Sequence, residues 1–226
     1  MMGRSLGRWM LFALGLIAFA AFSIAALRAQ QSAVFEIDFT NLQLVPSHWT
    51  LRLSPDGNGQ FDADGGQPAD QEAKMIWASD VHRPIQLSSA FTAQVFSTAR
   101  MRKWFAFPCE SHLKVAFQGM KRLSYSGPEG RGACEYNYSK DKEIEELGNS
   151  LVAVEFTILS GARMEKLLQH DRLGLDQELD NLLTALHDGN AAEVGTIHET
   201  LTRIASDEEV MERVRRKARE LLTQIR

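Results

Sequence analysis

The residues best suited to binding a metal ion stand in Ser54–Gly66, with the sequence SPDGNGQFDADGG. Its three aspartates and one asparagine supply oxygen donors of the kind that calcium loops use. Counted from Asp56, however, the fifth, sixth and twelfth positions lack the ligand, glycine and carboxylate of such a loop. Asp-Gly and Asn-Gly dipeptides are instead favoured in tight hairpin turns. We therefore expect a hairpin and no metal ion. The alternative is a weak surface calcium site formed by Asp56, Asn58, Asp62 and Asp64.

Catalytic motifs of common enzyme classes are absent from the sequence. None of the six histidines belongs to an HExxH pair, and no GxSxG motif supplies a nucleophile elbow. Ser111 and His112 are adjacent, so on a strand they would point to opposite faces and would be poorly placed as nucleophile and base. The glycine-rich segment 127–132 lacks the Lys-Ser/Thr ending of a phosphate loop. The catalytic residues are therefore unknown, and no cofactor is expected.

Aromatic residues with a nearby arginine form the most suggestive candidate binding surface. Tyr125, Tyr136 and Tyr138 are expected to meet across a hairpin, close to Arg131. Aromatic side chains and arginine are common at recognition surfaces. The alternative is that the tyrosines pack beneath the helices as part of the core.

The chain has only two cysteines, Cys109 and Cys134. The N-terminal segment, described below, predicts export to an oxidising compartment, where such a pair forms a disulfide. Closing a loop of about 25 residues is worth roughly 3–4 kcal/mol in the chain-entropy model. The alternatives are two free thiols or a metal site, and zinc is disfavoured because no CxxC pair is present.

The N-terminal part shows the alternation of half-buried strands. Apolar residues alternate with polar ones in segments 33–39 and 49–53, and a short return strand is expected at 60–62. The polar residues 63–82 are expected to form a loop. A helix is predicted over about 89–102, with Ser88 or Ser89 as its N-cap. Strand patterns follow at 113–119, 121–127 and 133–139, and a turn is expected at 127–132.

From residue 141 onward, apolar residues recur at helical spacing. Helices are expected over 144–158 and on toward 168, over 175–190, over 191–205 and over 207–225. Gly189 is expected to end the second of them. The acidic residues 207–209 are expected in the first turn of the last helix, where they suit the helix dipole.

These elements predict an α+β fold. An antiparallel β-rich N-terminal part with one helix is followed by an all-helical C-terminal part. The expected organisation is a signal peptide at 1–29, a β-rich disulfide-containing region at 30–139 and a helical region at 140–226.

The first residues have the layout of a secretory signal peptide. Arg4 and Arg8 precede an apolar stretch from Trp9 to Leu27, and Ala29 supplies a small residue for cleavage. We therefore expect a secreted or periplasmic protein. The alternative is a protein anchored by an uncleaved N-terminal helix, because the apolar stretch is about long enough to span a bilayer.

A formal net charge of −4 argues against nucleic acid as a partner, because nucleic-acid binding needs a dense basic surface. The sequence favours an exported non-enzymatic binding or envelope-interaction protein of unknown ligand, with another protein or an envelope component as partner. The alternative is an exported hydrolase with a dispersed active site. A pocket where a carboxylate and a histidine converge would favour the hydrolase, and an apolar groove would favour the binding protein.

Overall fold

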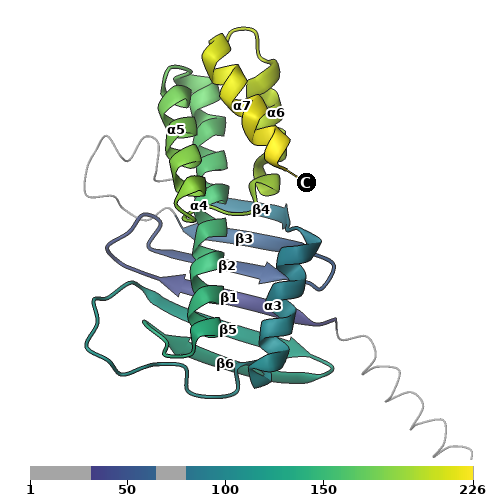
Figure 1. Ribbon diagram of the computed structural model, residues 1–226, viewed down its shortest axis with the longest axis vertical. Coiled ribbons are helices and arrows are strands. Elements are labelled where there is room, and N and C mark those ends of the chain that lie inside the picture. Colours follow the sequence, from purple (N-terminus) through teal and green to yellow (C-terminus); the bar gives the residue numbers. More distant parts are fainter. Residues whose placement is uncertain (1–31, 65–79, 226) are drawn as a thin grey trace, which may run out of the picture.

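The computed structural model describes residues 32–64 and 80–225. A six-stranded antiparallel sheet with the strand order β4-β3-β2-β1-β5-β6 is followed by a helical C-terminal half (Figure 1), which confirms the predicted α+β fold. The predicted signal peptide lies outside the described residues. Within the described ranges, none of the helices is long and apolar enough to cross a membrane.

The strands follow the alternation of apolar and polar residues in the sequence. In β1 the side chains of Phe35, Ile37 and Phe39 are buried, and those between them are partly exposed. This pattern is typical of a sheet with one covered and one solvated face. The strands are β1 (Val34–Thr40), β2 (His48–Leu53), β3 (Asn58–Asp64), β4 (Val81–Gln86), β5 (Met120–Gly127) and β6 (Gly130–Tyr136).

The stretch Ser54–Gly66 contains the turn of the β2–β3 hairpin, as predicted. The backbone N–H of Ser54 donates to the carbonyl of Asn58 at 2.8 Å, and Gly57 takes a positive φ of 84°. The Asp56 carboxylate accepts hydrogen bonds from the backbone and the side chain of Asn58, which lower the pKa of Asp56. These hydrogen bonds stabilise the turn, and their donors and acceptors all belong to residues of the hairpin itself.

Two strand predictions are wrong. Residues 113–119 form no strand, although their apolar residues alternate, and the backbone N–H of Val115 donates to the Leu113 carbonyl at 3.0 Å in a tight turn. Residues 81–86 form the edge strand β4 beside β3, which was not predicted; only its first two residues belong to the expected loop 63–82. Pro84 lies in this strand and lacks a donor for the ladder, which an edge position tolerates. Both differences come from strand pairing, which alternation within a segment does not determine.

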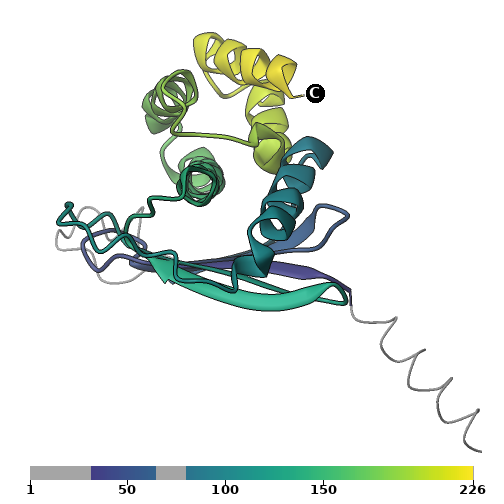
Figure 2. The ribbon, with the colours of Figure 1, turned by 60° about the horizontal axis from the view of Figure 1, so that its bottom comes forward.

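The α-helices of the described residues lie on one side of the sheet (Figure 2). Ser88 caps the first of them by accepting a hydrogen bond from the Phe91 backbone N–H, so the predicted helix and its cap are confirmed. The helices are α3 (Ser89–Met101), α4 (Lys142–His170), α5 (Gly174–His187), α6 (His198–Ser206) and α7 (Glu212–Gln224), with the 3-10 turns η1 (Lys103–Phe105) and η2 (Val194–Ile197).

Helix α4 connects two hydrophobic cores. Its first half, from Ile144 to Ile158, packs with the sheet and α3, and its second half, from Met164, packs with α5, α6 and α7. A Cβ atom at Gly148 would collide with the Tyr136 hydroxyl, so the glycine allows α4 to approach the sheet closely. The predicted boundary between the β-rich region and the helical region, at 139/140, therefore falls just before a helix that belongs to both cores.

The C-terminal helices differ from the prediction in their start points. Gly189, with a φ of 75°, follows α5 as expected. The segment 191–205 begins with η2 and becomes α-helical only at His198. The last helix begins at Glu212 instead of 207, so the acidic residues 207–209 precede it. Asp207 accepts a hydrogen bond from the backbone N–H of Glu209 in a local turn that competes with helix formation.

Candidate functional site

Two of the four residues predicted to bind a ligand are part of the core. Tyr125 is buried and stacks on Trp104 with ring centroids 4.4 Å apart. Tyr136 is fully buried, and its hydroxyl donates a hydrogen bond to the Ile144 carbonyl at 2.9 Å. Burial raises the pKa of the Tyr136 hydroxyl. The packing alternative therefore accounts for both tyrosines.

The other two predicted residues lie apart from this core. Arg131 is exposed on the face of β6 opposite Cys134 and Tyr136. Tyr138 follows the end of β6 and is partly exposed. The structure thus does not gather Tyr125, Arg131, Tyr136 and Tyr138 on one exposed surface, and their role in binding stays a prediction.

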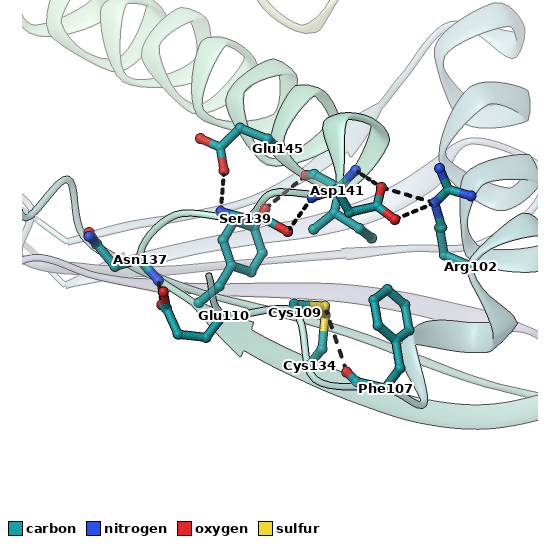
Figure 3. Close-up of a disulfide and its surroundings, with 11 residues drawn as sticks. Arg102, Phe107, Cys109, Glu110, Cys134, Asn137, Ser139, Asp141 and Glu145 are labelled. Carbon is teal, nitrogen blue, oxygen red and sulfur yellow. Dashed lines mark hydrogen bonds and ion pairs between the residues drawn. A yellow bond between two sulfur atoms is a disulfide. The ribbon is translucent and has the colours of Figure 1, made fainter. Parts of the chain in front are cut away.

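The predicted disulfide between Cys109 and Cys134 is confirmed, with Cα atoms 5.6 Å apart (Figure 3). Both cysteines are buried. The bond joins the segment that follows η1 to β6. It is compatible with an oxidising, extracytoplasmic location, because disulfides persist in such compartments.

Polar contacts near the disulfide join the segment 110–119 to the end of β6 (Figure 3). The Glu110 carboxylate accepts hydrogen bonds from the backbone N–H groups of Asn137 at 2.7 Å and His112 at 3.0 Å, which lower the pKa of Glu110. The Asn137 side chain in turn accepts from the Gln118 backbone N–H and donates to the Ala116 carbonyl. The segment 110–119 is therefore held in place although it belongs to no strand.

Exposed apolar side chains gather where this segment meets the β1–β2 loop. β1 and β5 are antiparallel neighbours with Thr40 opposite Met120. The β1–β2 loop and the segment that precedes β5 therefore lie at the same end of the sheet. In the described part of the chain, five of the seven exposed large apolar side chains lie on them. We call this group the apolar edge. It consists of Leu42, Leu44, Leu113, Val115 and Phe117.

A groove of about 920 Å³ lies beside the apolar edge and shares Leu44 with it. It runs along α4 and is also lined by the β1–β2 loop, α5 and the residues after α5; we call it the α4 groove. None of the described residues that line it is a histidine or a cysteine. The larger apolar side chains of the lining are Phe39, Leu44, Val45, Pro46, Val152, Phe156 and Leu159.

Glu155 is the most perturbed titratable group of the α4 groove. Burial raises its pKa to about 7, and the positive charge of Arg163 offsets only part of this effect. The side chain is partly exposed, yet dense protein surrounds it. Among the side-chain hydrogen bonds and ion pairs of the described residues, none involves the Glu155 carboxyl group. An ionisable group with a strongly shifted pKa in a groove is a candidate for binding or catalysis.

Arg163, which also lines the groove, is held by a buried ion pair. Its guanidinium lies 2.8 Å from the Glu178 carboxylate on α5 and donates to the Ser160 hydroxyl at 2.7 Å. The guanidinium carbon lies 5.7 Å from the centre of the Phe156 ring. This arrangement fixes Arg163 between α4 and α5 and commits its charge to Glu178.

Histidine and aspartate pairs lie on the solvated face of the sheet. His48 lies between Asp38 and Asp64, at 3.3 and 3.2 Å, and His82 lies 2.9 Å from Asp62. The hydrogen bond to Asp62 raises the pKa of His82 and lowers that of Asp62. In the described residues, no group of three or more side chains is arranged to hold a metal ion.

Glu155 was not among the residues predicted from the sequence, although its position in an apolar run could have indicated it. Glu155 is the only charged residue in the run LVAVEFTIL over residues 151–159. A carboxylate inside such a run marks a side chain that costs free energy to bury and so calls for an explanation.

No protein-family model matches the chain, and no curated protein matches its sequence.

Proposed function

We propose that the protein is an exported, non-enzymatic binding protein that takes a partly apolar ligand in the α4 groove. The observation that supports this function best is the groove itself, where an apolar wall adjoins the Glu155 carboxyl group. Small-molecule sites are typically concave and mostly apolar, with a few polar groups that fix orientation. A volume of about 920 Å³ is within the usual range of about 300–1,000 Å³ for such sites.

The apolar edge supports an interaction role as well. Exposed apolar patches on soluble proteins mark interaction surfaces more often than isolated exposed residues do. The edge adjoins the groove through Leu44, so a ligand presented by another protein or by an envelope component would reach both features. The hydrolase alternative lacks comparable support, because no described histidine lines the groove beside Glu155.

A neutral apolar dye tests the groove. We expect Nile red to bind the protein with a rise in fluorescence, and Asn149→Trp to weaken binding by about tenfold or more because the indole fills the groove. Asn149 is an exposed residue of α4 that lines the groove. Gln177→Trp is the matched control, because Gln177 is exposed on α5 outside the groove lining. A fluorescence titration measures both variants.

Phe117→Ser separates the groove from the apolar edge in the same experiment. If the groove binds the dye, this variant keeps most of the wild-type affinity, because Phe117 lies outside the groove lining. Dye binding that is unchanged in Asn149→Trp, or that is lost only in Phe117→Ser, would contradict the proposed function of the groove.

Export is supported by the disulfide and by the charged, apolar and small-residue pattern of the N-terminal sequence. We expect mass spectrometry of the protein from its native host to find an N-terminus near Gln30 or Gln31. An intact chain that begins at Met1 in the membrane fraction would instead support the anchored alternative.

A further inference from the structure

The α4 groove contains a carboxyl group whose hydrogen-bonding capacity the other described residues leave unused. The Glu155 side chain takes part in none of the side-chain hydrogen bonds or ion pairs found among the described residues. An ionised carboxylate is an acceptor with two oxygens, and its burial is costly unless donors or a positive charge compensate it. A ligand that brings a cation to Glu155 would supply this compensation.

The charges around the groove also favour a cationic ligand. Glu146, which pairs with Lys142 at 3.4 Å, is a second carboxylate of the lining, and the β1–β2 loop contributes no charged residue. Arg163 is the only cationic side chain among the described lining residues, and its guanidinium already pairs with Glu178 at 2.8 Å. An anionic ligand would therefore meet two carboxylates and one guanidinium, which already pairs with Glu178.

The rest of the lining suits an apolar body attached to that cation. Leu44, Val45 and Pro46 of the β1–β2 loop line the groove together with Leu159, one turn of α4 after Glu155. From this juxtaposition we infer that the ligand is an amphipathic amine, with its ammonium group on the Glu155 carboxylate and its aliphatic or aromatic body against the β1–β2 loop. This inference rests on the proposed function of the groove.

A pair of ligands that differ only in charge tests the inference. The probes are 2-phenylethylamine and 2-phenylethanol, which share an apolar body and differ in the ammonium group. At pH 8 we expect the full chain to bind the amine about tenfold more tightly than the alcohol, as charge-assisted hydrogen bonds predict. Isothermal titration calorimetry measures both affinities.

Two isosteric variants identify the carboxylate responsible. Glu155→Gln keeps the shape of the side chain and removes its charge, so it should abolish the preference for the amine and leave binding of the alcohol unchanged. Glu208→Gln is the matched control, because Glu208 is exposed outside the groove lining, and it should keep the preference. Thermal unfolding of each variant checks that the fold is retained.

The pH dependence of binding provides a second measurement. The pKa of Glu155 is about 7, so its ionised fraction rises from about one tenth at pH 6 to about nine tenths at pH 8. The amine stays protonated over this range, as a lysine side chain does. Affinity for the amine should therefore rise roughly tenfold from pH 6 to pH 8 in the wild type, and this rise should vanish in Glu155→Gln.

The outcomes separate this inference from the proposed function. If the alcohol and Nile red bind in the groove but the amine has no advantage, or keeps its advantage in Glu155→Gln, the ligand class is wrong and the groove remains a binding site. If neither probe nor the dye binds, both proposals are overturned. An amine preference that requires Glu155 and follows pH as described supports both.

Discussion

Replacing Arg163 by leucine is expected to lower the free energy of unfolding by about 3–5 kcal/mol at pH 7, because it breaks a buried ion pair. The side chains of Arg163 and Glu178 are only 10% and 6% exposed, and the pair joins α4 to α5. Without the guanidinium, the Glu178 carboxylate must either stay charged in a buried site or take up a proton. Urea unfolding followed by circular dichroism measures the loss.

The double variant Arg163→Leu, Glu178→Leu isolates the ion pair. Replacing both partners removes the buried charges together, so we expect the double variant to be more stable than Arg163→Leu alone. A double variant less stable than the single one would contradict this account.

An exposed ion pair provides the control. Arg216 and Glu220 lie one turn apart on α7, with side chains 67% and 59% exposed. Arg216→Leu removes the same type of charge but leaves Glu220 in water, so we expect a change within about 0.5 kcal/mol. A similar loss at both sites would show that burial does not explain the effect of Arg163→Leu.

Removing the disulfide is expected to have the second large effect. The variant Cys109→Ser, Cys134→Ser should lose about 2–5 kcal/mol of stability, the usual cost for a native disulfide in a small secreted domain. The two cysteines are 25 residues apart in the sequence, so the bond closes a loop that the unfolded chain would otherwise sample freely. Urea unfolding of the oxidised wild type and the variant measures this difference.

The regions where hydrogen exchange increases in this variant show whether the disulfide stabilises only its own surroundings or the whole protein. Hydrogen exchange should increase most in β5, in β6 and in the segment 110–119, which the disulfide and the bonds of Glu110 hold together. The helices α5, α6 and α7 pack in a separate core and should change less. Equal increases in both parts, or two free thiols in the denatured wild type, would contradict this role of the bond.

Local patterns were sufficient for much of the fold. The alternation in β1 and β2 and the Asp-Gly-Asn-Gly turn predict two strands and a hairpin, because each depends on residues close together in the chain. Helix α3 and its Ser88 cap are encoded in the same local way. The disulfide was predictable because a chain with two cysteines allows only one intramolecular pairing.

Pairing between distant segments was not predictable from such patterns. The sequence of β4 contains Pro84 and resembles that of a loop, yet the segment forms an edge strand because it pairs with β3. The segment 113–119 alternates like a strand, but the chain places it beside the end of β6, where Asn137 fastens it and its apolar side chains stay exposed. Alternation indicates a backbone conformation and does not identify a partner strand.

By itself, the sequence determined the α+β class, most of the strands and helices, and the cysteine pair, because these follow from local periodicity and composition. The tertiary structure decided which polar groups line a groove and which are buried in the core. Tyr125 and Tyr136 lie in the core because α3 and α4 cover their face of the sheet. Glu155 is distinguished from the other carboxylates of α4 because the chain folds Leu44 and its loop, more than a hundred residues earlier, against the same groove. Burial of a charge depends on such distant neighbours, and no local pattern records them.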